Sequence, residues 1–150
     1  FYLMQRTNAQ ILFIPDRTKG FISAENGTVS LSNIMVPVVR EPSPESAIKD
    51  AAALGYAMGD KTVSISLVHV GEASGIPPVS LPAYAGCSWN QVIRNGEAAD
   101  EINALAYVLP ADLIVMTTRG RSSSGCSRRG SVTARVLQQA PCPVLIISEP

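Results

Sequence analysis

Residues 112–147 read DLIVMTTRGRSSSGCSRRGSVTARVLQQAPCPVLII, and this stretch decides the fold. Short apolar, β-branched runs at 112–117 and 143–148 predict strands that are buried on both faces. Between them, a loop of Gly, Ser and Arg leads into apolar residues at helical spacing, Val132, Val136 and Leu137. A strand, a loop, a helix and a second strand in this order form the repeating unit of a parallel α/β sheet.

The remainder of the chain continues this alternation. One helix is expected to begin with Ser43 as its N-cap and Pro44 in its first turn and to end at Gly59, and another to run from about Gly96 to Val108. Further strands are predicted at 10–14, 33–39, 63–70 and 89–94. The pattern predicts an α/β fold with an open, mostly parallel five-stranded sheet and helices on both faces.

Two segments interrupt the alternation. Glu25-Asn26-Gly27-Thr28 is a two-residue hairpin signal, so residues 1–32 are expected to form a β-extension ahead of a domain at 33–150. The connection from Gly71 to Cys87 contains three prolines and no helical periodicity, and it predicts a loop. We therefore expect one flank of the sheet to be less well covered, and exposed sheet surface invites a partner.

The composition excludes several classes of protein. The 150 residues are 46% hydrophobic and 16% charged, which suits one folded domain rather than a disordered chain. Twelve basic and twelve acidic residues cancel, which argues against a general nucleic-acid binder. The longest apolar runs are too short to cross a membrane, so a soluble domain is expected. The chain begins with Phe1 and without a signal-peptide pattern, so we expect it to be part of something longer.

The charges are unevenly distributed along the chain. No acidic residue occurs between Asp112 and Glu149, so this stretch carries a net charge of +5, whereas residues 41–72 are acidic on balance. The five basic residues of the stretch are Arg119, Arg121, Arg128, Arg129 and Arg135. Two solvated surfaces of opposite sign are the general interpretation of such runs, and an anion site in the C-terminal third is the sharper one.

The loop at 117–131 favours the anion site. Glycines let backbone N–H groups approach an anion, and Gly130-Ser131 opens a helix whose first N–H groups have no partner inside the helix. The helix dipole and the position at the carboxyl edge of the sheet add to this, so the loop predicts a phosphate site. On spacing alone, a flexible connection with solvated Arg side chains is an equally weighted alternative, because the loop is neither a Walker A nor a dinucleotide fingerprint.

Cysteine and histidine indicate no catalytic or metal centre. Cys87, Cys126 and Cys142 are odd in number and widely spaced, which predicts no disulfide, no zinc site and a reducing cytoplasm. Cys142 is expected to be a buried thiol, and Cys126, beside several Arg, is the candidate for a reactive one. The single histidine, His69, lies in a predicted buried strand and is interpreted as a core residue rather than a base. We therefore predict that the protein is not an enzyme.

In order and spacing, these motifs resemble the universal stress protein family. Members carry a strand, a Gly-x-x-Gly-x9-Gly-Ser/Thr loop, a helix and an Ala-Pro-Cys-Pro-Val-Leu strand. Here Gly120, nine residues and Gly130-Ser131-Val132-Thr133 reproduce the second half of the loop, and residues 140–147 reproduce the ending. The resemblance covers about 33–148 and implies a Rossmann-like fold with the layout of nucleotide-binding α-hydrolases. It also makes residues 8–15 similar to the closing strand of a preceding domain, as in tandem members.

Nucleotide-binding members of the family hold ATP between the first and fourth strands of the domain. Carried over to this chain, the candidate site residues are Pro37, Val38, Val39, Val70, Met116, Thr117, Gly120, Arg121, Gly130, Ser131, Val132 and Thr133. Two of them depart from the family pattern, because Val39 replaces an Asp that meets the nucleoside and Thr117 replaces the first loop Gly. Arg119 also stands where a His is common. Loss of a charged hydrogen bond costs about 1.5–3 kcal/mol, roughly ten- to a hundredfold in affinity, so binding is expected to be weakened without being abolished.

Two functions are therefore weighed. The first is a cytoplasmic stress-response module that binds ATP, AMP or another anion, with or without magnesium. The alternative is a module for dimerisation or tandem-domain packing that binds no nucleotide, and in neither case is a membrane or general nucleic-acid partner expected. Hydrolysis would need a metal-holding carboxylate near the loop, and Val39 removes the obvious candidate, which leaves weak ATP hydrolysis as the remaining enzymatic alternative.

Overall fold

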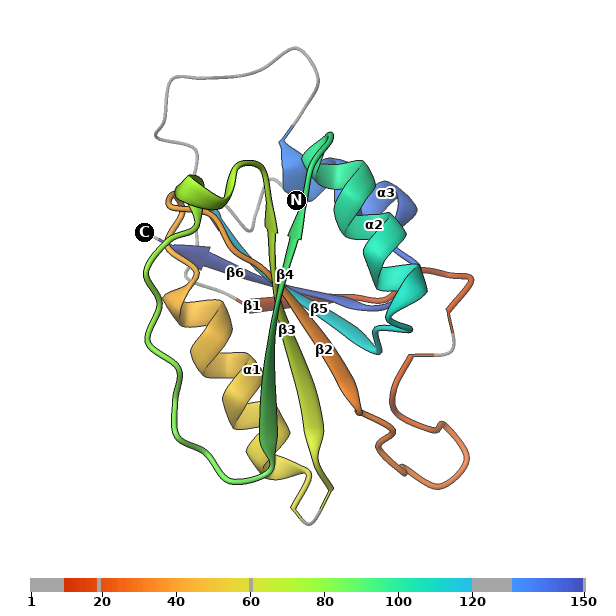
Figure 1. Ribbon diagram of the computed structural model, residues 1–150. Helices are drawn as coiled ribbons and strands as arrows, with labels where there is room; N and C mark the ends of the chain where they lie inside the picture. The colour runs from red at the N-terminus through yellow and green to blue at the C-terminus, as the bar shows by residue number, and fades with distance from the viewer. Residues whose placement is uncertain (1–9, 19, 60, 120–130, 150) are drawn as a thin grey trace.

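The computed structural model describes residues 10–18, 20–59, 61–119 and 131–149. These residues form one six-stranded sheet with helices packed on both of its faces (Figure 1). The elements in chain order are β1 (Gln10–Phe13), β2 (Asn33–Pro37), α1 (Glu45–Ala57), β3 (Val63–Val70), the 3-10 helix η2 (Ala73–Gly75), β4 (Cys87–Arg94), α2 (Ala98–Val108), β5 (Leu113–Arg119), α3 (Val132–Gln139) and β6 (Val144–Glu149).

The strand order is β1-β6-β5-β2-β3-β4, and the strands from β6 to β4 are mutually parallel. This confirms the predicted five-stranded parallel sheet. The extension adds β1, which pairs antiparallel with β6 at the edge of the sheet. From β2 the chain moves outward to β3 and β4, and then returns to β5 on the other side of β2. The strand order therefore reverses between β2 and β5, which is the switch point where open α/β sheets bind ligands.

The helices bury the two faces of the sheet separately, with α1 on one face and α2 and α3 on the other (Figure 1). Side chains alternate between faces along a strand, and the central strand β2 shows both environments. Ile34 and Val36 lie in the core beneath α1, whereas Met35 lies in the core beneath α2 and α3. All three are almost completely buried, which explains why this strand carries consecutive apolar residues instead of alternating apolar and polar ones.

Two helices start later than predicted. Pro44, not Ser43, is the N-cap of α1, and the Ser43 hydroxyl accepts the N–H of Glu45 at 3.4 Å. Pro44 has a φ of −82° but a ψ of −1°, so regular helical geometry begins only at the following residue. In α2 the helix begins two residues after Gly96, because Gly96 has a φ of +144° and a Cβ there would meet the Glu101 side chain.

The segment before β2 forms a hairpin with a longer turn than the Asn-Gly pair predicts. An isolated antiparallel bridge holds it, and the N–H of Ser23 donates to the Thr28 carbonyl at 2.8 Å. The N–H of Gly27 donates to the Ser23 carbonyl at 2.9 Å, so four residues rather than two form the turn. The predicted two-residue turn is wrong, because the Asn26 side chain instead accepts the Thr28 N–H at 3.0 Å.

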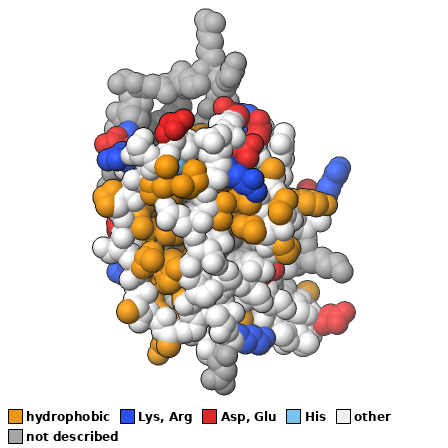
Figure 2. Space-filling model, viewed as in Figure 1, with side chains coloured by type: hydrophobic (Ala, Val, Ile, Leu, Met, Phe, Trp, Pro, Cys, Tyr) orange, Lys and Arg blue, Asp and Glu red, His pale blue; other side chains and the backbone are white. Residues whose placement is uncertain are grey.

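The long connection between β3 and β4 contains only the short helix η2, as its lack of periodicity predicts. It passes α1 on its way to β4, and β4 forms the edge of the sheet on this side (Figure 1). Leu81, Tyr84 and Ile93 remain exposed there, and Figure 2 shows hydrophobic side chains across the middle of this face of the molecule. The predicted thin cover of one flank is confirmed. No helix in the described part of the chain has the length and apolar content of a membrane span.

Candidate functional site

A cavity of about 330 Å³ opens at the carboxyl ends of β2 and β5, at the switch point of the sheet. Its floor comes from β2, β3 and β5, and its walls come from the loop after β2 and from the first turns of α2 and α3. Its size lies at the lower end of the range of small-molecule sites. The fold thus brings segments more than ninety residues apart in the sequence to one place, from Pro37 to Thr133.

Most of the residues predicted from the sequence lie at this cavity. Nine of the twelve line it: Pro37, Val38, Val39, Val70, Met116, Thr117, Ser131, Val132 and Thr133. The other three, Gly120, Arg121 and Gly130, lie outside the described residues. The loop after β2 and the N-terminus of α3 therefore meet at one cavity, as the family resemblance implies.

The cavity also has seven lining residues outside the twelve candidate site residues, although the sequence analysis named one of them, Arg119, in the basic stretch. They are Glu41, Pro42, Val68, Ala98, Ile102, Thr118 and Arg119. Ala98 and Ile102 stand at the start of a helix that was predicted, and a helix that follows a parallel strand begins at the carboxyl edge of the sheet. The predicted start of this helix could therefore have indicated these two residues. Glu41 carried no local signal, because its role depends on a contact with a residue 78 positions away.

The floor of the cavity is buried and its rim is open. Val38 and Met116 are buried apolar side chains, while Thr117 and Thr133 are buried and carry hydroxyl groups. Val39 is 42% exposed at the rim, so a charged residue there would stay in contact with water. The site therefore offers apolar contact surface for a ring system and a few hydroxyl groups that can orient it.

The N-terminus of α3 forms one wall of the cavity. Ser131 is its N-cap, and the Ser131 hydroxyl accepts the N–H of Ala134 at 3.2 Å. This bond satisfies one of the first-turn N–H groups, while those of Val132 and Thr133 have no acceptor within the helix itself. These N–H groups and the positive end of the helix dipole favour an anion at this wall.

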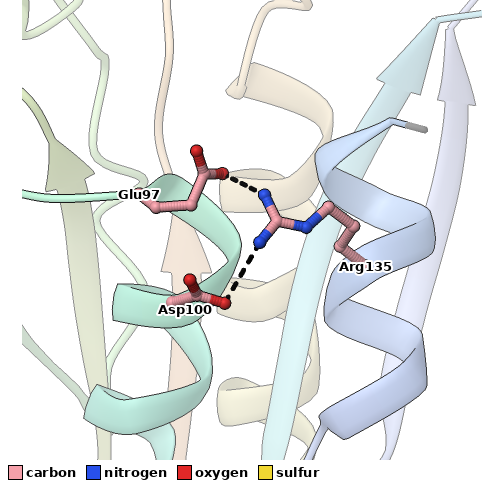
Figure 3. A network of polar contacts seen from close by, with 3 residues as sticks. All are labelled: Glu97, Asp100 and Arg135. Carbon is pink, nitrogen blue, oxygen red and sulfur yellow. Dashed lines mark hydrogen bonds and ion pairs between the residues drawn. The ribbon is translucent and has the colours of Figure 1, made fainter. Parts of the chain in front are cut away.

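An ion-pair network holds the first turns of α2 and α3 together (Figure 3). The Arg135 guanidinium on α3 donates to the carboxylates of Glu97 and Asp100 on α2, at 3.2 Å in the case of Asp100. These carboxylates also lie at the positive end of the α2 dipole, where negative charge is stabilising. Because both helices line the cavity with their first turns, the network links two of its walls.

A second ion pair lies at the mouth of the cavity. Arg119 at the end of β5 donates a hydrogen bond to the carboxylate of Glu41 in the loop after β2. Both side chains line the cavity, and they are the only charged residues among its described lining residues. The described part of the site therefore has no net charge.

The remaining titratable candidates have structural roles. His69 is buried, and its Nδ1 and Nε2 lie 3.1 and 3.0 Å from the carbonyl oxygens of Val38 and Glu72, so its predicted place in the core is confirmed. Burial raises the pKa of the Cys142 thiol to about 12, which agrees with the predicted inert thiol, whereas Cys126 lies outside the described residues. Among the described residues, no group of three or more His, Cys, Asp or Glu could hold a metal ion.

Comparison with known proteins gives consistent matches. Residues 80–148 match the model of the universal stress protein family. The chain is 27% identical to a universal stress protein of Synechocystis over 89% of this chain and 94% of that relative. It is 41% identical to a universal stress protein of Thermus aquaticus over 56 residues, which are 37% of this chain and 41% of that relative.

Solved structures show the same fold. A universal stress protein from Archaeoglobus fulgidus is similar over 98% of this chain and 52% of its own, with a TM-score of 0.70 and 18% identity, so this chain spans about half of its length. A universal stress protein in complex with cAMP matches 79% of this chain and 97% of its own, with a TM-score of 0.57 and 18% identity. A family member from Arabidopsis thaliana with AMP bound matches 79% of this chain and 92% of its own, with a TM-score of 0.51 and 18% identity.

Proposed function

We propose that the chain is a universal stress protein, a stress-response module that binds an adenine nucleotide in the cavity between β2 and β5. The observation that carries this proposal is the convergence of an apolar floor and the α3 N-terminus on one cavity at the switch point of the sheet. The AMP and cAMP held by two proteins of the same fold support the choice of ligand. Binding rather than catalysis is the proposed activity, and the cytoplasmic location stays a prediction.

The two ends of the cavity suit the two ends of a nucleotide. The adenine would lie on the apolar floor near Val38 and Met116, and the phosphates would lie at Val132 and Thr133, where the α3 N-terminus favours an anion. The open rim at Val39 would hold the ribose without a carboxylate to bind its hydroxyls. We therefore expect affinities for ATP and AMP that are weaker than a site with that carboxylate would give.

Calorimetric titration with ATP and AMP, with and without magnesium, tests this proposal. Ala98 on α2 lines the cavity, and Ala98→Trp would fill it and is expected to abolish the binding heat. Ala104→Trp on the exposed side of the same helix is the matched control and should bind like the wild type. The absence of saturable heat at millimolar nucleotide would refute the proposal, and so would equal binding by both tryptophan variants.

A second candidate function, domain packing, is favoured by the surface of β1. Its residues Ile11, Leu12 and Phe13, with Ile14 beyond the strand end, are apolar and all more than a third exposed. Consecutive residues of a strand point to opposite faces, so apolar side chains stand open on both faces of this edge strand. We propose that a second universal stress domain covers them, either as a second copy of the chain or as a tandem neighbour.

Sedimentation at high protein concentration tests the homodimer. Leu12→Glu is expected to shift the protein towards the monomer, because it buries a charge at the packed strand. Val108→Glu places the same charge on the exposed end of α2 and serves as the control. A monodisperse wild-type monomer would contradict self-association and leave the tandem arrangement, which a chain with a second domain tests directly.

A further inference from the structure

The ion pair between Glu41 and Arg119 bridges the two strands that form the proposed nucleotide site. Arg119 is the last residue of β5, and Glu41 lies four residues beyond the end of β2, which pairs directly with β5. Both side chains line the cavity, so the pair lies at the position where a ligand enters between these strands. Glu149 in β6 pairs in register with Arg119, but its carboxylate accepts a hydrogen bond from the Ser46 hydroxyl on α1.

A carboxylate and a phosphate compete for the same donors of a guanidinium. Arg presents its N–H groups as a planar fork, and this fork matches both anions in the same bidentate geometry. Arg119 is the only cation among the described residues that line the cavity. A phosphate that binds Arg119 must therefore displace the Glu41 carboxylate or share the guanidinium with it. An uncharged nucleoside leaves the ion pair intact.

We propose that Glu41 sets the charge preference of the site by competing with the ligand phosphate for Arg119. This inference rests on the proposed nucleotide function and specifies how the site selects its ligand. Glu41 disfavours AMP and ATP relative to adenosine, and it does so only through Arg119. The side chains of Arg119 and Glu41 are 44% and 73% exposed, so solvent screens the pair and its effect on affinity is modest, about two- to fivefold.

The test is calorimetric titration of adenosine, AMP and ATP into the wild type, Glu41→Gln, Arg119→Gln and the double variant. Glu41→Gln is expected to tighten AMP and ATP about two- to fivefold and to leave adenosine unchanged. In the Arg119→Gln background the same substitution is expected to change nothing. Glu25→Gln removes an equal charge from the hairpin turn that precedes β2, at the other end of the strand from the cavity, and should bind like the wild type (Figure 1). The gain from Glu41→Gln should shrink in about 0.5 M salt.

Three results would overturn the inference. Equal tightening in the Arg119→Gln background would mean that Glu41 acts through the general field of the site. Loss of adenosine affinity in Glu41→Gln would mean that the carboxylate contacts the nucleoside. Unchanged AMP and ATP affinities in Glu41→Gln would show that Glu41 does not compete with the phosphate, and the proposed function would still stand. If none of the three compounds binds the wild type or any variant, the proposed function itself fails, and this inference fails with it.

Discussion

Val39→Asp is expected to tighten adenine nucleotide binding by about tenfold. Val39 stands at the rim of the cavity, in the loop after β2, where the family resemblance implies a carboxylate that meets the nucleoside. A hydrogen bond from a ribose hydroxyl to a carboxylate contributes about 1.5–3 kcal/mol, and partial exposure of the rim favours the lower value. A gain of about 1.5 kcal/mol corresponds to roughly a tenfold lower Kd.

The fold should tolerate this substitution. Val39 is 42% exposed and follows the end of β2, so an Asp there stays hydrated and changes the free energy of unfolding by about 0.5 kcal/mol or less. Thr117→Gly, the other change towards the family pattern, is a poorer test. Thr117 is buried in β5, where it pairs with Ile147 of β6, and Gly there weakens the strand itself.

The N-terminus of α3 supplies the matched control. Val132 is 40% exposed at the first position of α3, so Val132→Asp adds the same charge at the same exposure but beside the proposed phosphates. It should stabilise the helix slightly through the dipole, yet weaken ATP binding by repulsion. The assay is calorimetric titration of ATP and AMP into both variants, with thermal melts to show that they fold. Equal effects of the two substitutions on nucleotide affinity, or no gain in affinity from a folded Val39→Asp, would refute this account of the site.

Three further predictions concern stability. Neither amide atom of buried Asn103 has a partner in the described structure, so Asn103→Leu should raise the free energy of unfolding by about 1–2 kcal/mol in denaturant titrations, and a loss would contradict the packing described for α2. Ser131→Ala removes the α3 cap and should lower Tm by about 2–4 °C, whereas Ser131→Asp should not. Burial, and secondarily the charge of Asp112, raises the pKa of Cys142 from 9.0 to about 12. The thiol therefore contributes stability below pH 9 that is lost as pH rises towards 12, and Cys142→Ala should flatten the dependence of the unfolding midpoint on pH in that window; an unchanged slope would contradict this.

The sequence predicted the sheet because the sheet depends on local pattern. Doubly buried strands such as β2 and β5 require continuous apolar runs, and the helix following each requires apolar residues at helical spacing. The turn before β2 was predicted less well, since the Asn26 side chain decides its hydrogen bonding and the Asn-Gly pair alone does not. The start of α2 was misplaced because Gly96 adopts a φ that is closed to most residues, and a sequence pattern does not show this.

The part of the candidate site that lies in or beside recognisable sequence motifs was predicted. Val39 and Val132 were named from the family resemblance of the strand and loop motifs beside them, and both line one cavity. Contacts between distant side chains carried no such signal. The pairs of Arg119 with Glu41 and of Arg135 with Glu97 join residues 78 and 38 positions apart, and each depends on how two elements meet in space.

These long-range pairs change the interpretation of the charge pattern. The basic stretch between Asp112 and Glu149 suggested either an anion site in the C-terminal third or a solvated basic surface separate from the acidic one. In the structure, both Arg of this stretch within the described residues are already engaged by carboxylates. Arg135 is committed to holding α2 against α3, whereas Arg119 pairs with Glu41, a residue of the acidic stretch. The two runs of opposite sign therefore meet at the mouth of the cavity, and a phosphate that reaches Arg119 has to compete with an anion that the chain itself supplies.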